Sequence, residues 1–152
     1  MRLHILAVGK AKAGPQRDLY DLYAGRLRWP LRLIEVEEKR KLASDALKAR
    51  EAELLLAQLP AGAKLCALDE HGTAAGSADF AGWLRQWQDQ GVADIAFAIG
   101  GADGDGAALL ARADRKLALG ALTWPHMLVR GMLAEQLYRA QQILAGHPYH
   151  RE

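Results

Sequence analysis

The sequence predicts an α/β protein built on a parallel sheet. Short apolar runs rich in β-forming residues alternate with longer stretches of helical period, which is the pattern of repeated strand–helix–strand units. The 152 residues contain no internal repeat, linker or low-complexity tract, and only residues 69–79 form a long polar connection. A chain of this size buries a core of its own, so residues 1–152 are expected to form a single domain.

The predicted strands and helices follow one another along the chain. Strands are expected at residues 3–8, 31–36, 64–68, 94–99 and 116–122, and helices at 15–28, 43–59, from Ser77 onward, at 105–115 and at 126–144. Pro15 suits the first turn of a helix, and Ser77 is expected to cap the third helix. Phe80, Leu84 and Trp87 follow at the spacing of one buried helical stripe.

Composition excludes several classes of protein. No apolar run approaches the ~20 residues that span a bilayer, and the apolar run at residues 5–8 reads as a first strand, since no cleavage site follows it. Cys66 is the only cysteine, so no internal disulfide forms. Its apolar setting predicts a buried strand thiol. We therefore expect a cytosolic protein.

The charge is small overall but unevenly distributed. The net charge is +2, yet residues 1–50 hold 12 Lys and Arg against 6 Asp and Glu, and the remainder holds 8 against 12. A basic face for RNA is one interpretation, and an ordinary solvated surface is the other. Its members would be Lys10, Lys12, Arg26, Arg28, Arg32 and residues 39–41.

A glycine-rich segment, IGGADGDG at residues 99–106, follows the fourth predicted strand. Ligands of open α/β sheets bind beyond the carboxyl ends of strands, so this loop is a candidate site. Its spacing matches neither nucleotide-binding glycine motif, and Asp103 and Asp105 would repel a pyrophosphate. The glycine-lysine stretch at 8–15 is not a phosphate loop either. A neutral or cationic ligand fits the segment better, and a plain strand-to-helix turn is the alternative.

His126 and Arg130 stand at the start of the last predicted helix. A helix N-terminus disfavours the imidazolium form, so His126 is a candidate proton acceptor near neutral pH. Arg130, four residues on, lies on nearly the same face and is expected to grip a phosphate or a nucleobase edge. An ordinary surface pair is the alternative.

Five ordered segments resemble one family. They are LHILAVGK (3–10), LDEHGTAAGSADFA (68–81), FAIGGADG (97–104), LALGALTWPHMLVRGMLAEQLYRA (117–140) and the terminal HPYHRE (147–152). They are similar to the ribosomal RNA large subunit methyltransferase H family, SPOUT-class enzymes that methylate N3 of a pseudouridine in helix 69 of 23S rRNA. The fourth and fifth segments are the most specific.

The resemblance implies a SPOUT methyltransferase fold with a C-terminal trefoil knot, a homodimer, and S-adenosylmethionine as the cofactor, with no metal. General topology rules argue against knots, so only the resemblance carries that expectation. It places the cofactor beside Leu68, Gly100, Leu119, Gly120, Ala121, Leu122, Thr123 and Trp124. Ala102, Gly120 and Trp124 replace a more frequent Pro, Ser and smaller apolar residue, which we expect to alter the affinity of the pocket rather than abolish activity.

The resemblance also gives the C-terminal tail, residues 147–152, a place beside the cofactor pocket. Tyr149 is then expected to stack on the target base and Arg151 to contact a phosphate. His126 is the candidate base, with Arg130 stabilising the developing negative charge, and His150 is the competing base. A tail that only packs at the dimer interface is the alternative.

Two other functions remain open. A non-catalytic ribosome-binding module would use the basic face without binding S-adenosylmethionine. A flavodoxin-like nucleotide binder would need a phosphate loop after the first strand.

Overall fold

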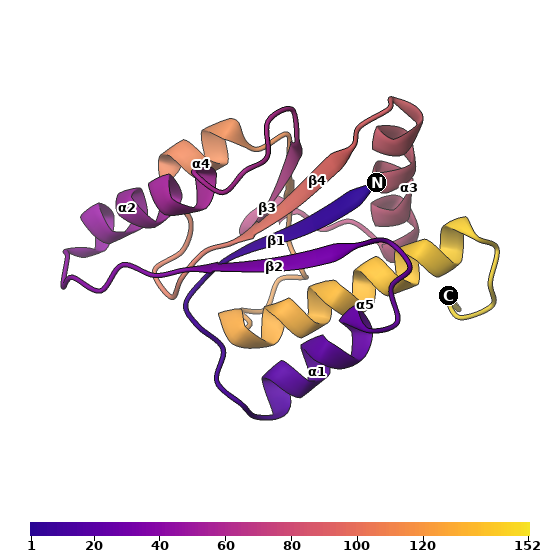
Figure 1. The fold of residues 1–152 in the computed structure, drawn as a ribbon, viewed down its shortest axis with the longest axis horizontal. Coiled ribbons are helices and arrows are strands. Elements are labelled where there is room, and N and C mark those ends of the chain that lie inside the picture. Colours follow the sequence, from indigo (N-terminus) through magenta and orange to yellow (C-terminus); the bar gives the residue numbers. More distant parts are fainter.

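A computed structural model describes residues 1–152 as a parallel five-stranded sheet with helices on both faces (Figure 1). The strand order is β2-β1-β4-β3-β5. The strands are β1 (Arg2–Val8), β2 (Leu31–Val36), β3 (Lys64–Thr73), β4 (Asp94–Ile99) and β5 (Arg115–Leu117). The helices are α1 (Pro15–Ala24), α2 (Ser44–Leu56), α3 (Ser77–Asp89), α4 (Ala107–Arg112) and α5 (His126–Leu144). The predicted parallel α/β class is confirmed.

Alternate residues of the central strands enter two different cores, as the period of a strand requires. Leu3 and Ile5 of β1 pack toward α3 and α5, whereas Leu6 packs toward α2 and α4. Figure 1 shows α2 and α4 on one side of the sheet and α1 and α5 on the other. All six residues of β4 are buried, which is typical of a strand covered on both faces.

Helix α5 is the main support of the sheet on its own side. Leu133 and Leu137 are fully buried in the core that α5 shares with α3. On the outer side α1 packs against α5, and a Cβ at Gly131 would lie 2.8 Å from Leu19 Cδ2. A glycine at 131 therefore lets α1 approach α5 closely.

The last strand differs most from the prediction. The sequence favours a strand over residues 116–122, but β5 ends at Leu117 and the chain then leaves the sheet. Gly120 has φ of +97°, a conformation that suits glycine and does not occur within a strand. The apolar residues at 119–122 consequently belong to a loop, although their composition is that of a strand.

Three smaller expectations also need correction. Helix α1 ends at Ala24 rather than at residue 28, and α4 is confined to Ala107–Arg112. Ser77 does not cap α3, because the N-cap residue is Gly76 and the Ser77 hydroxyl donates instead to Gln136 Oε1 of α5 at 2.8 Å.

The buried-thiol prediction is confirmed. Cys66 is fully buried in β3, and burial raises the pKa of its thiol to about 12. None of the helices is both long and apolar enough to cross a membrane.

Candidate active site

A cavity of about 720 Å³ opens at the carboxyl edge of the sheet, where the second half of β3 meets the loops that follow β4 and β5. This is the edge at which open α/β sheets bind their ligands. The volume lies within the usual range of roughly 300–1,000 Å³ for small-molecule sites. The start of α5 completes the wall with Pro125, His126 and Val129.

Most of the residues that the resemblance assigns to the cofactor line this cavity. They are Leu68, Gly100, Leu119, Gly120, Leu122, Thr123 and Trp124. Ala121 belongs to the same loop but does not line the cavity. Three chain segments that are far apart in the sequence therefore meet around one space.

The loop over residues 118–125 has a defined shape and an apolar edge. The indole Nε1 of Trp124 donates to the carbonyl of Leu119 at 2.9 Å, which closes the loop on itself. Leu122 and Trp124 nevertheless leave 71% and 38% of their surface exposed. Large apolar side chains that border a cavity and remain exposed are typical of a ligand or partner site.

The glycine-rich loop both turns tightly and lines the cavity. Gly101 and Gly104 pair across the turn, with Gly104 at φ of +92°. A Cβ at Gly101 would lie 2.9 Å from Glu51 Oε2 of α2, so the loop lies directly against that helix. Both earlier interpretations of this segment, a turn and a ligand loop, are compatible with the structure.

The cavity is rich in carboxylates. Asp69, Glu70, Asp103 and Asp105 line it, together with Lys48, His71 and His126. Both carboxylate oxygens of Asp105 are buried and have no hydrogen-bond partner. Burial, together with the negative charge of Asp69, raises the pKa of Asp105 to about 7. The nearby N–H of Gly100 lies outside hydrogen-bonding geometry and offsets only part of this shift.

His126, the candidate proton acceptor, lies in the cavity wall. Its Nε2 would lie 3.8 Å from a Cβ at Gly9, which places the ring beside the end of β1. Burial, reinforced by the positive charge of Arg130, holds the pKa of His126 below its usual value. The imidazole is therefore neutral at physiological pH and able to accept a proton.

Arg130 does not face the cavity, and the expectation that it grips a phosphate or nucleobase is not met. Its side chain is 2% exposed and its Nη1 donates to Glu35 Oε2 at 2.6 Å. Its Nη2 donates to the carbonyls of Val8 and Gly9 at 3.2 and 2.7 Å. The guanidinium thus joins α5 to the carboxyl ends of β1 and β2, beneath the loop that faces His126.

Glu35 is the acidic partner in this junction. Its Oε2 also accepts from the N–H of Ala11 at 2.6 Å. Burial alone would raise the pKa of Glu35, but the hydrogen bonds from Arg130 and Ala11 outweigh it and hold that pKa below its usual value. Arg130 and Glu35 are therefore assigned to the architecture of the site.

The C-terminal tail folds back onto the far end of α5. The Tyr149 ring meets Tyr138 edge-on with centroids 4.8 Å apart, and its hydroxyl donates to Glu135 Oε1 at 3.0 Å. His150 Nδ1 lies 3.1 Å from Arg139 Nη1, and Arg151 is exposed. The tail is thus ordered by specific contacts.

The tail lies away from the cavity of its own chain. The cavity is at the first turn of α5 and the tail at its last, where Figure 1 places the C-terminus. The 19 residues of α5 span about 28 Å. The tail therefore does not lie beside the cavity of its own subunit, and its expected place beside a cofactor pocket stays a prediction.

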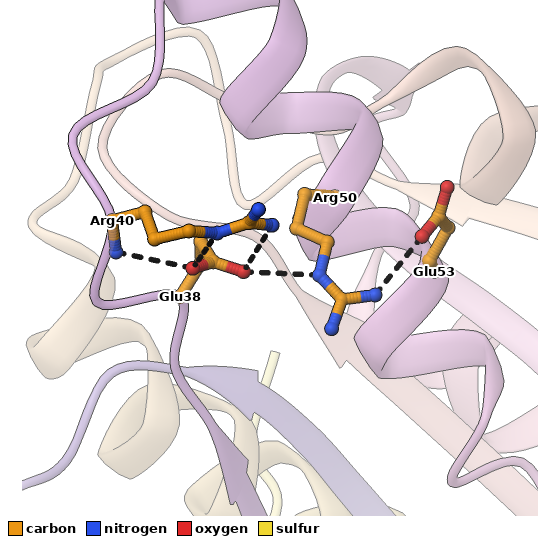
Figure 2. Close-up of polar contacts among 4 residues, drawn as sticks. All are labelled: Glu38, Arg40, Arg50 and Glu53. Atoms are coloured by element: carbon orange, nitrogen blue, oxygen red, sulfur yellow. Dashed lines mark hydrogen bonds and ion pairs between the residues drawn. The ribbon is translucent and has the colours of Figure 1, made fainter.

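The basic run at residues 39–41 follows β2 at the same edge of the sheet as the cavity. Figure 2 shows Glu38 held between Arg40 and Arg50, with Glu53 on the outer side of Arg50. Hydrogen bonds from Arg40, reinforced by Arg50, lower the pKa of Glu38 to about 2. Arg40 is thus neutralised locally, whereas Lys39 and Lys41 are exposed.

The acidic half of the cavity wall is what sequence reasoning missed. Asp69 and Glu70 directly follow Leu68, the predicted end of the third strand, so strand-end position was a signal for both. The sequence indicates Asp105 as a group that repels a pyrophosphate and suits a neutral or cationic ligand, but not as a buried one. Its burial depends on how the glycine loop folds against α2, which no local pattern indicates.

Comparison with known proteins identifies the class to which this fold and cavity belong. A family model described as "Predicted SPOUT methyltransferase" matches residues 1–150. The chain is 65% identical to a protein of Paramagnetospirillum magneticum and 63% identical to one of Rhodospirillum rubrum, in each case over 99% of both chains. Another relative, from Rhodospirillum centenum, is 62% identical over the same shares. All three are named ribosomal RNA large subunit methyltransferase H. The chain belongs to this family of SPOUT methyltransferases.

Proposed function

We propose that the protein transfers a methyl group from S-adenosylmethionine to N3 of a pseudouridine in helix 69 of 23S rRNA, within the assembled ribosome and in the cytoplasm. The observation that carries this proposal is the 65% identity to a ribosomal RNA large subunit methyltransferase H over 99% of both chains.

The cavity fits the cofactor in size and in chemistry. Its apolar edge at Leu122 and Trp124 suits the adenine ring, and its unpaired carboxylate at Asp105 suits a cation. Backbone groups of the loop at 118–125 and of Gly100 would hold the polar parts of the cofactor. When bound there, S-adenosylmethionine supplies an electrophilic methyl carbon on a sulfonium.

The work of the protein is then to align the nucleophile and to remove its proton. N3 of pseudouridine is an imide nitrogen that is protonated at neutral pH, so a neutral base must be nearby. His126 lies in the cavity wall with a lowered pKa and is our candidate to accept this proton. As the N–H proton moves to the imidazole, the nitrogen forms its bond to the methyl carbon. The electron pair of the broken carbon–sulfur bond stays on sulfur.

The tail takes part only if a second subunit supplies it. Tail and cavity lie at opposite ends of α5, so a pairing with two antiparallel α5 helices would bring each tail to the cavity of the other subunit. We propose a homodimer of this kind, with Tyr149 stacking on the target base, His150 as the competing base and Arg151 contacting a phosphate. The weak net charge suits an enzyme that selects its substrate by the shape of the ribosome.

Mass spectrometry of helix 69 nucleosides from cells that lack this protein tests the proposal. We expect the N3-methylated pseudouridine to disappear and to return when the wild-type gene is restored. Unchanged methylation in the deletion strain would defeat the proposal. Calorimetry of the purified protein with S-adenosylmethionine separates the enzyme from a non-catalytic ribosome-binding module, which would show no binding.

A further inference from the structure

The carboxyl group of Asp105 has no partner in the structure. Both oxygens are buried without a hydrogen bond, and a Cβ at Gly100 would contact Oδ1, so the group lies against Gly100 in the cavity wall. Burial of a carboxylate costs free energy unless a hydrogen bond or an opposite charge offsets it. A natural protein that retains such a group at a ligand site is expected to compensate it when the ligand binds.

The charges around Asp105 do not provide that compensation. The groups that share its cavity are Asp69, Glu70 and His71 of β3, Asp103 in its own loop, Lys48 from α2, and His126 from α5. Glu51 of α2 lies behind the same loop, and one of its carboxylate oxygens is also unpaired. Four carboxylates therefore face a single lysine around the cavity, which favours a cationic ligand over an anionic one.

We propose that Asp105 is the counter-charge that makes this cavity select the methylated, cationic cofactor over its neutral, demethylated product. The inference rests on the proposed use of S-adenosylmethionine. The donor carries a sulfonium, and the product of methyl transfer, S-adenosylhomocysteine, is a thioether that has lost this charge. Apart from the transferred methyl group and this charge the two ligands are the same, so a buried carboxylate distinguishes them by charge. Selection of this kind favours donor binding and product release.

Ionisation of Asp105 links this selectivity to pH. A pKa of about 7 means that a large fraction of the ligand-free protein is protonated at Asp105 near neutral pH. A cation in the cavity stabilises the carboxylate and lowers this pKa, so binding releases a proton. Affinity for the donor should therefore increase as the pH rises from 6.0 to 7.5, while affinity for the product should change less.

The test is calorimetric titration of the purified wild-type protein and of Asp105→Asn with both ligands. We expect the substitution to weaken donor binding about tenfold at pH 7.5, less than a fully dry charge pair would give because the cavity is open to water. Product binding should change less than about threefold. Asp89→Asn is the matched control, since it removes the same charge from an exposed position at the end of α3, outside the cavity, and should leave the ratio of the two affinities unchanged.

Proton release on donor binding is a second measurement, and it would not change if the role of Asp105 were purely structural. Titrations at pH 6.5 in two buffers of different ionisation enthalpy should show release on donor binding to wild type and markedly less for Asp105→Asn. Thermal unfolding should show that Asp105→Asn is folded, because the substitution removes a buried charge that has no partner and breaks no hydrogen bond. Equal losses of donor and product affinity, or no loss of either, overturn this inference. Failure of the wild-type protein to bind the donor at all would instead overturn the proposed function.

Discussion

Replacement of Arg130 by methionine tests whether this residue builds the site or acts on the substrate. Arg130→Met keeps most of the side-chain volume but removes the guanidinium that donates to Glu35 and to the carbonyls of Val8 and Gly9, so Glu35 keeps only the N–H of Ala11. Removal of one partner of a buried pair costs roughly 3–5 kcal/mol. The side chain of Glu35 is 28% exposed, so we expect the lower end, about 3 kcal/mol. For a domain of this size, that corresponds to a fall in Tm of roughly 6–12 °C.

Chemical and thermal unfolding monitored by circular dichroism measure this loss. Arg40→Met is the matched control, because Arg40 is 67% exposed and its partner Glu38 keeps Arg50, so it should cost less than about 1 kcal/mol. Glu35 has a lowered pKa in the folded protein, so its contribution is present above the unfolded pKa of about 4.3 and is lost as the pH falls through the folded value. The difference in free energy of unfolding between wild type and Arg130→Met should therefore become smaller in acid. Unfolding within about 1 kcal/mol of wild type, combined with lost methylation, would refute the structural assignment and favour a role on the substrate.

Three further predictions concern the tail, the basic loop and the base. Deletion of residues 149–152 should abolish methylation while dimer mass and donor affinity stay close to wild type; full activity of the truncated protein would rule out a tail in the active site. Lys39→Ala with Lys41→Ala should reduce the slope of log affinity for ribosomes against log salt by about 1–2, whereas Lys64→Ala, at the opposite end of the sheet, should leave it unchanged. An unaltered slope in the double variant would count against this basic face. His126→Gln should slow single-turnover methylation about 10²–10⁴-fold. In wild type the rate should decline in acid with a midpoint below the usual histidine pKa of about 6.5, and the variant should lack this decline. A rate close to that of wild type would point to His150 as the base.

The fold was predictable because the spacing and length of the apolar runs distinguish strands from helices along the chain. β4 is six apolar or buried residues in a row, and Leu133 and Leu137 lie one turn apart on α5, so period and length alone identify both elements. The end of β5 was not predictable, since residues 118–122 have strand composition and leave the sheet at a glycine with positive φ. The trefoil knot implied by the resemblance stays a prediction.

The site was predictable in position but not in the roles of its charged groups. Strand-end loops and the resemblance both indicated the cavity that Gly100 and Trp124 line. Arg130 shares a helix face with His126 in sequence, but its long side chain reaches back to Glu35, a residue 95 positions away that no local pattern connects to it. The place of the tail within its own subunit was not predictable for a similar reason, because contacts such as Tyr149 with Glu135 depend on the direction in which the chain turns after α5.

Methylation of isolated ribosomes tests the central claim most directly. Ribosomes from a strain that lacks this protein would be incubated with the purified wild-type chain and S-adenosylmethionine, and the helix 69 fragment would be analysed by mass spectrometry. The account predicts one added methyl group per fragment, located at N3 of a pseudouridine and absent when either the protein or the cofactor is omitted. A fragment that gains no methyl group, or that gains it on another nucleotide, would contradict the account.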